Sequence, residues 1–217
     1  RVAGIQPDCI VVVATVKALK LHGGADKAGL SEENLEALEK GLPNLYKHIE
    51  NMRTVYKKPV VVAMNRFASD TAAEIEAVMR GVEKAGAKAV FTDVFLKGGE
   101  GGRELAAAVC EAAQQKSELH FAYDLNDSIE KKIGDIVKNV YGGEGAEFSE
   151  IAREKIAEAE ARGYGKLPVI VAKTQYSLSD DAKLLARPQG FKVRVRDIIV
   201  KGGAEFIVAV AGNIMLM

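Results

Sequence analysis

Several side chains with binding chemistry follow one strongly apolar run of the sequence. The run is Val60 to Met64, and Asn65, Arg66, Phe67 and Asp70 come soon after it. A continuous β-branched run predicts a strand buried on both faces, as in a parallel sheet. Ligands of open α/β sheets bind beyond the carboxyl ends of the strands, so these polar and aromatic groups indicate a binding site. The alternative is that Asp70 only caps the next helix and Phe67 only fills an edge of the core.

The glycine-rich stretch Lys97 to Gly102 is a second place where chemistry is expected. A run from Ala89 to Phe95 precedes it and predicts a strand, and a helical pattern from Glu104 to Ala113 follows it. Glycines let backbone N–H groups approach an anion closely, and the N-terminus of the next helix adds partial positive charge. The pattern therefore favours a phosphate site. A flexible lid is the alternative, since the chain has no Gly-x-x-x-x-Gly-Lys-Ser/Thr motif.

The third polar stretch is Lys173 to Asp181, which follows the apolar run Leu167 to Ala172. That run predicts another buried strand. Lys173 leaves the strand end, where an ammonium group can meet a phosphate or a carboxylate. Loops of Ser and Asp are also common as plain solvated turns, which is the alternative here.

Helical patterns indicate the elements that hold these loops. Thr71 to Glu74 has the spacing of a capping box. Apolar residues then recur at helical spacing, at Ile75, Val78, Met79 and Val82. The run Ile10 to Ala14 predicts a further strand buried on both faces, and Asn34 to Leu45 predicts a helix that is interrupted near Pro43. This alternation predicts an α/β fold with a mostly parallel sheet and flanking helices.

The pattern changes in the last part of the chain. We expect a short strand from His120 to Tyr123, a helix that starts at Asp127 or Ser128, a loop from Tyr141 to Gly145, a surface helix from Glu150 to Arg162, and strands at Lys192 to Arg196 and Phe206 to Ala211. The C-terminal part is therefore expected to be β-rich. The expected division is 1–142, which carries the first two polar loops, and 143–217.

Composition excludes some classes of partner. The 217 residues are 48% hydrophobic and 28% charged, with 30 basic and 30 acidic side chains. This balance gives no overall field for nucleic acid or anionic lipid, and no apolar run reaches the ~20 residues that span a bilayer. Cys9 and Cys110 have neither metal-ligand nor disulfide spacing, so we expect a reducing, cytoplasmic setting and no metal site. The chain starts at Arg1 and ends on apolar residues, which leads us to expect a piece of a longer protein.

The chain resembles the formate-tetrahydrofolate ligase (10-formyltetrahydrofolate synthetase) family along essentially its whole length. The segments that carry the resemblance are Val11 to Lys20 with His22 to Gly24, Glu33 to Leu35, Gly41 to Leu45, Asn65 to Phe67 with Asp70 and Thr71, Lys97 to Gly102, Tyr123 to Leu125 with Ser128 and Ile129, Leu167 and Pro168, Ala172 to Asp181, and Arg187 and Pro188 with Phe191.

The resemblance implies an α/β enzyme of P-loop NTPase type, usually a homotetramer. It implies that formate, ATP and tetrahydrofolate are the substrates and that formyl phosphate is the intermediate. ATP with Mg²⁺ is expected to be bound mainly by a P-loop part upstream of Arg1, so this chain alone is expected to be inactive. A non-catalytic folate- or partner-binding assembly module is the alternative function.

The resemblance also implies roles for individual residues. In the family two aromatic rings hold the pterin, and the matching positions are Phe67 and Phe95, the second of which is often Trp in related enzymes. Two strand-end aromatics can supply the parallel apolar faces that a flat heteroaromatic ring needs. We expect Lys97 to act catalytically on phosphate charge. Nucleotide or phosphate contacts are expected at Asn65, Gly98, Gly99, Lys173, Gln175 and Ser177.

Overall fold

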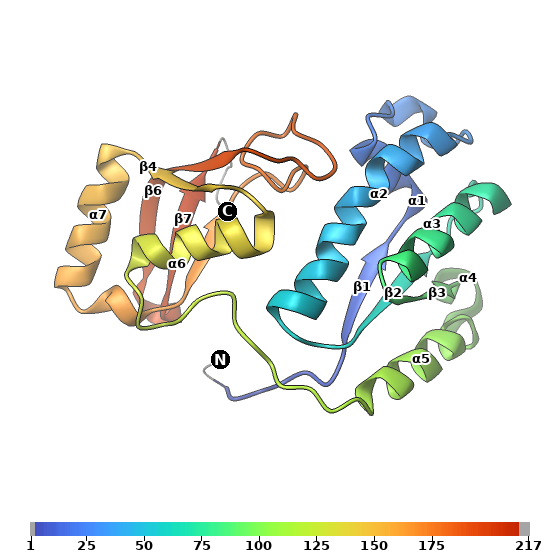
Figure 1. Ribbon diagram of the computed structural model, residues 1–217, viewed down its shortest axis with the longest axis horizontal. Helices are drawn as coiled ribbons and strands as arrows, with labels where there is room; N and C mark the ends of the chain where they lie inside the picture. The colour runs from blue at the N-terminus through green and yellow to red at the C-terminus, as the bar shows by residue number, and fades with distance from the viewer. Residues whose placement is uncertain (1–2, 213–217) are drawn as a thin grey trace. The chain divides into compact units, whose positions relative to one another are not determined.

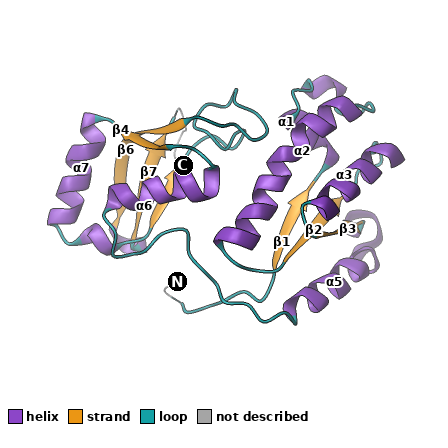
Figure 2. Cartoon of the chain, viewed as in Figure 1, coloured by secondary structure: helices purple, strands orange, loops and turns teal. Residues whose placement is uncertain are grey.

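The computed structural model describes residues 3–212, and the chain divides into two compact units between His120 and Phe121 (Figure 1). Each unit has its own sheet and its own helices (Figure 2). The division expected between residues 142 and 143 lies inside the second unit, after a helix and before a strand.

The sheet of the first unit is parallel, with strand order β1-β2-β3. Its strands are β1 (Ile10–Ala14), β2 (Val60–Asn65) and β3 (Lys88–Thr92). β2 lies in the middle and is buried along its apolar run, as its sequence predicts. Because Asn65 at the end of β2 pairs in register with Thr92 at the end of β3, the loops that follow both strands leave the same edge of the sheet.

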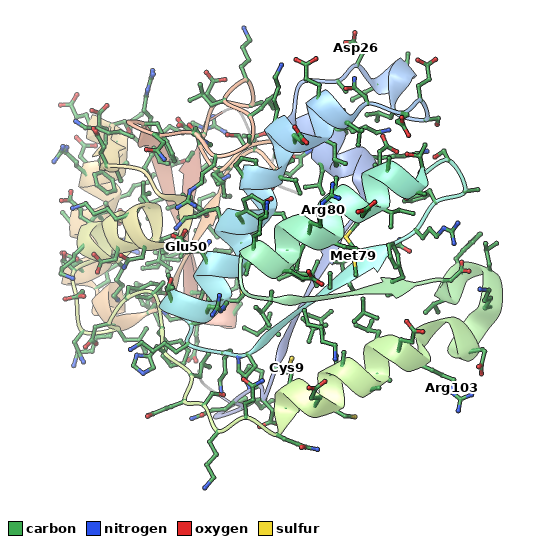
Figure 3. All side chains as sticks on the ribbon, turned by 45° about the vertical axis from the view of Figure 1, so that its right-hand side comes forward. Cys9, Asp26, Glu50, Met79, Arg80 and Arg103 are labelled. Carbon is green, nitrogen blue, oxygen red and sulfur yellow. The ribbon has the colours of Figure 1, made fainter. Side chains whose placement is uncertain are left out.

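Helices cover both faces of this sheet. α1 (Val16–His22), α2 (Leu35–Glu50) and α3 (Ala72–Lys84) pack on the face that carries Val62 and Met64, whereas α5 (Arg103–Ala113) packs on the face that carries Val61 and Val90. Figure 1 shows α5 on the opposite side of the sheet from α2 and α3. The exposed side chains of Arg80 on α3 and Arg103 on α5 mark the solvent sides of the two helical layers (Figure 3).

The predicted interruption of the second helix near Pro43 is wrong, because α2 continues through this residue. Proline removes one backbone donor, but the helix buries a long apolar stripe that includes Leu38, Leu42 and Ile49 and that outweighs the loss. α1 and α2 also pack at very short range. A Cβ at Gly41 would lie 1.8 Å from the backbone oxygen of Leu19, so only glycine allows this approach.

Two further strand predictions for the first unit need correction. β1 is buried on one face only, because Val11 and Val13 are 39% and 67% exposed. The reason is that α5 packs against β2 and β3 and does not extend over the edge strand β1. β3 ends at Thr92 rather than continuing to Phe95, which lies in the short helix α4 (Val94–Lys97).

The second unit has a mixed sheet of order β4-β6-β7-β5. Its elements are α6 (Ile129–Asp135), β4 (Gly145–Phe148), α7 (Glu150–Ala161), β5 (Val169–Ala172), β6 (Lys192–Lys201) and β7 (Phe206–Ala211). β4 pairs parallel with β6, β5 pairs parallel with β7, and β6 and β7 are antiparallel. α6 and α7 cover one face with an apolar core between helices and sheet. The β-rich character expected of the C-terminal part is thus present, although β4 was not expected.

The strand predicted from His120 to Tyr123 is absent, so that prediction is wrong. The segment instead contacts the sheet through the side chain of Tyr123, which bonds to the first residue of β5. The Tyr123 hydroxyl accepts a hydrogen bond from the Val169 N–H at 2.8 Å and donates one to the Val169 carbonyl at 3.0 Å. No helix within residues 3–212 is long and apolar enough to cross a membrane.

Candidate functional site

The loop between β2 and α3 is held by two carboxylates. Thr71 is the N-cap of α3 and forms a reciprocal capping box with Glu74, as predicted. Asp70 is therefore not the capping residue. Its Oδ2 accepts a hydrogen bond from the backbone N–H of Phe67 at 2.9 Å, and the side chain is only 9% exposed. The carboxylate thus ties the start of the loop to its end.

The ring of Phe67 lies at the surface rather than in the core. Phe67 is 41% exposed, so it remains available to a ligand. The ammonium group of Lys17 lies over this ring, 5.0 Å from its centroid. A cation at this distance is attracted by the negative face of an aromatic ring. Lys17 therefore belongs to the site, although the sequence did not single it out.

The loop after β3 presents the second aromatic ring. Phe95 lies in α4 and is 95% exposed. Nζ of Lys97, the last residue of α4, is 3.1 Å from Oδ2 of Asp93; the lysine side chain is 63% exposed and the aspartate side chain 19%. Ion pairs at the surface contribute about 0–1 kcal/mol, so the exposed ammonium group can exchange Asp93 for another anion.

The glycines of this loop have unequal roles. Gly98 has φ 56° and ψ −142°, a conformation that side chains disfavour. The Gly101 carbonyl accepts a hydrogen bond from the Asp93 N–H at 3.1 Å, and a Cβ at Gly101 would lie 2.4 Å from the Asp93 oxygen. A Cβ at Gly99 would meet nothing within 4 Å. Gly98 and Gly101 therefore close the loop into a compact turn.

The sheet brings the two aromatic loops to neighbouring positions. Asn65 and Thr92 are partners in the β2–β3 register, and the Arg66 N–H donates to the Thr92 carbonyl at 3.4 Å. Phe67 and Phe95 follow these paired ends within a few residues, and both are exposed. Asn65 is half-buried at the same edge. The first unit therefore presents two aromatic side chains, an amide and the cation Lys97 along one edge.

The third polar loop belongs to the second unit, and many of its polar groups form hydrogen bonds within the loop itself. Nζ of Lys173 donates to the carbonyls of Thr174 and Ser177 and lies 4.8 Å from the centroid of the Tyr141 ring. Burial lowers the pKa of Lys173 to about 8, although the charge of Asp180 acts in the opposite direction. This lysine therefore carries an ammonium group that is less firmly protonated than usual.

The other predicted residues of this loop differ in exposure. Ser177 is buried; its hydroxyl donates to the Leu184 carbonyl and accepts from the Ser179 N–H, so it braces the loop. Gln175 is exposed. Next to the loop lies an open groove of about 820 Å³, whose lining includes Thr174 and the cations Lys183, Lys192, Arg194 and Arg196. Lys173 is not among the groove's lining residues.

A buried ion pair next to the β2–α3 loop was also missed from the sequence. Nζ of Lys20 is 2.8 Å from Oε1 of Glu74, and the two side chains are 1% and 0% exposed. Burial alone raises the pKa of Glu74, but the hydrogen bonds from Lys20 and from backbone N–H groups outweigh it and lower the pKa below its usual value. The available signal was a lysine one helical turn after Lys17, just beyond a strand.

Metal ligands are not grouped in the described part of the chain. Within residues 3–212, no three or more His, Cys, Asp or Glu side chains form a group that could hold a metal ion.

One comparison with known proteins identifies the family. The sequence model of the formate-tetrahydrofolate ligase family matches residues 1–217, which is the whole of this chain. The match includes the β2–α3 loop, the glycine loop after β3 and the polar loop after β5, the same stretches that the residues themselves single out. The chain belongs to the formate-tetrahydrofolate ligase family.

Proposed function

We propose that this chain supplies the folate-binding side of an ATP-dependent ligase that formylates tetrahydrofolate from formate. The observation that carries the proposal is the pair of exposed aromatic residues, Phe67 and Phe95, which follow register-paired ends of β2 and β3. A pterin is a flat heteroaromatic ring, and two aromatic faces can hold it by stacking. The two loops leave one edge of the sheet, where α/β folds bind ligands.

The proposed reaction has two steps, as the family resemblance implies. A formate oxygen bonds to the γ-phosphorus of ATP and ADP leaves, which gives formyl phosphate. The folate N–H nitrogen then attacks the formyl carbon, the bond between that carbon and the phosphate oxygen breaks, and the nitrogen loses its proton to the departing phosphate or to water, which gives 10-formyltetrahydrofolate. Lys97 serves both steps by neutralising phosphate charge, because its exposed ammonium group can leave Asp93 for another anion. Asn65, Gly98 and Gly99 line the same edge.

The proposal assigns a supporting role to the polar loop after β5. Lys173, Gln175 and Ser177 are proposed to contribute to nucleotide or phosphate binding, with Ser177 acting through the loop that it braces. The wider assembly is proposed to be a cytoplasmic homo-oligomer with a sheet of P-loop NTPase type. The parallel sheet with helices on both faces supports that fold type.

The chain is proposed to work together with a phosphate-binding loop outside these 217 residues. No Gly-x-x-x-x-Gly-Lys-Ser/Thr motif occurs in the sequence, and such a loop is the usual cradle for the β- and γ-phosphates. ATP with Mg²⁺ would then be held mainly by that part, while the residues described here hold the folate and steady the transferred group.

The aromatic pair is tested by Phe67→Ala and Phe95→Ala in the full-length protein. Each change should remove one stacking face, at a cost of about 1 kcal/mol or somewhat more, and raise the tetrahydrofolate Kd several-fold. ATP affinity should remain nearly constant. Isothermal titration calorimetry with each ligand measures both values, and Phe121→Ala, which removes an exposed phenylalanine of the second unit, is the matched control.

Two other outcomes would change the interpretation. Equal loss of ATP and folate affinity in the Phe67 and Phe95 variants would mark them as general structural residues. Unchanged folate affinity, together with loss of a protein partner, would favour the non-catalytic assembly module, for which the exposed apolar side chains of Val94, Phe95 and Leu96 in α4 offer a surface.

A further inference from the structure

Lys20 and Glu74 form an ion pair that is buried away from water. Their mutual attraction does not by itself offset the free energy needed to desolvate both charges. The two side chains are 1% and 0% exposed, and their charged atoms are 2.8 Å apart. Removing two charges from water is expensive, and well-packed apolar residues are often as stabilising as a buried ion pair. The pair therefore matters for which segments of the chain it holds together, rather than for how much it stabilises the fold.

The carboxylate of Glu74 joins three segments of the first unit. Its Oε1 accepts hydrogen bonds from Nζ of Lys20 and from the backbone N–H of Asn34, at 2.8 and 3.0 Å. Its Oε2 accepts from the Thr71 N–H at 3.2 Å. Nζ of Lys20 also donates to the Glu32 carbonyl at 2.7 Å. One buried carboxylate thus connects α1, the segment before α2 and the first turn of α3.

These connections continue into the aromatic loop. Thr71 directly follows Asp70, whose carboxylate holds the Phe67 N–H at 2.9 Å. Lys17 lies one helical turn before Lys20 on α1, and its ammonium group lies 5.0 Å from the centroid of the Phe67 ring. α1 therefore reaches the loop by two routes: Lys20 is linked to the Thr71 backbone through the Glu74 carboxylate, and Lys17 lies over the Phe67 ring.

We propose that the Lys20–Glu74 pair is a positioning device for the folate site, which fixes the 65–70 loop against α1. Lys17 then covers one face of the Phe67 ring, and the opposite face receives the pterin. This inference rests on the proposed function and deepens it at the same site. A ring that is held in place before the ligand arrives loses less conformational freedom on binding, which raises affinity.

The test uses Glu74→Gln and Lys20→Met in the full-length protein. Glu74→Gln keeps the shape of the side chain and removes its charge, and Lys20→Met keeps most of the length and removes the ammonium group. Each should raise the KM and Kd for tetrahydrofolate about tenfold. The KM for ATP and the kcat at saturating folate should change less than twofold.

A second buried lysine provides the matched control. Lys132 of the second unit is 0% exposed, and its Nζ donates to the carbonyls of Gly165 and Leu167. Lys132→Met should lower the Tm as the Lys20 change does, because it also leaves buried carbonyl groups without that donor. It should leave the folate Kd unchanged. Equal effects of the two lysine variants on folate affinity would overturn the proposal.

Double-mutant cycles test whether the buried pair affects folate affinity through Phe67. In a Phe67→Ala background, Glu74→Gln should cause no further loss of folate affinity, because the ring that it positions is gone. Lys17→Ala leaves the buried pair intact and should weaken folate binding in the wild-type background more than in the Glu74→Gln background. Additive losses in both comparisons would overturn the positioning role.

The failure of this inference is distinct from the failure of the proposed function. If Phe67→Ala lowers folate affinity but Glu74→Gln lowers only the Tm, the proposed function stands. The buried pair is then only a structural element. Phe67→Ala that leaves folate affinity intact would overturn the proposed function and this inference together.

Discussion

At the scale of single residues, exposure separates the side chains that can meet a ligand from those that hold the site together. Phe95, Phe67 and Lys97 are open to solvent, whereas Asp70 and Ser177 are buried and bonded to neighbouring backbone. The sequence placed Phe95 at the end of a predicted strand and the other four in loops that follow strands, and it could not distinguish these two roles. Whether such a side chain is exposed or buried depends on which atoms the folded loop covers, and a local sequence pattern does not predict this.

Lys97 offers the sharpest test of catalytic function. Lys97→Ala in the full-length protein should lower kcat at least tenfold and change the folate KM little, because a cation beside a glycine loop acts on phosphate charge. Steady-state kinetics with saturating substrates measure both quantities. Arg103→Ala is the control, since Arg103 is an exposed cation near the same loop whose partner is Glu100. Normal turnover in Lys97→Ala would show that the lysine is a solvated surface residue.

Lys173 should titrate near pH 8, well below the usual range for a lysine. Its pKa is lowered to about 8 by burial, so between pH 8 and the usual lysine pKa of about 10.4 the unfolded chain holds a proton that the folded chain lacks. The contribution of this residue therefore makes the free energy of unfolding rise with pH across that interval. NMR titration of isotope-labelled lysine, assigned with Lys173→Met, should give a midpoint near pH 8. A midpoint close to 10.4, the usual value, would contradict the expectation.

At the scale of elements, the best-predicted part of the fold is β2, the loop after it and α3. A continuous apolar run and a capping box are both local signals, so the strand and the start of α3 at Thr71 follow from the sequence. Errors arose where a distant element decides the outcome. β1 has the same kind of run as β2, but it lies at the edge of the sheet, and α5 leaves Val11 and Val13 uncovered. A single apolar run does not show whether its strand lies in the middle or at the edge of the sheet.

The turn that carries Phe95 should depend on one glycine. A Cβ at Gly101 would lie 2.4 Å from the Asp93 backbone oxygen, so Gly101→Ala forces the turn to open and displaces α4. We expect folate affinity to fall in the full-length protein, as measured by calorimetry. Gly99→Ala is the control, because a Cβ there meets nothing within 4 Å, and it should retain wild-type affinity. Equal affinities in the two variants would show that the turn does not position Phe95.

At the scale of the whole molecule, the candidate site residues belong to two compact units. The aromatic loops belong to the first unit, and the loop with Lys173 belongs to the second. The family match spans residues 1–217 and therefore covers both units. The sequence could identify this membership because the relevant loops are continuous segments, whereas the partition between His120 and Phe121 depends on contacts that form only in the folded chain.

The 217-residue chain by itself should show no formate-dependent turnover of ATP. Phosphoryl transfer requires a cradle for the β- and γ-phosphates, and the sequence lacks the glycine-lysine motif that usually supplies one. The measurement is formate- and tetrahydrofolate-dependent release of ADP from the purified chain, compared with the full-length protein as the positive control. Turnover by the chain alone would contradict the proposed division of labour.

The contact between Tyr123 and Val169 has a consequence for solubility. β5 is an outer strand of its sheet, and unpaired outer strands can recruit strands from other molecules. One phenol group satisfies both the N–H and the carbonyl of Val169, as a neighbouring strand would. With a single side chain, Tyr123 thus occupies the two backbone groups of Val169 that a strand from another molecule would otherwise pair with.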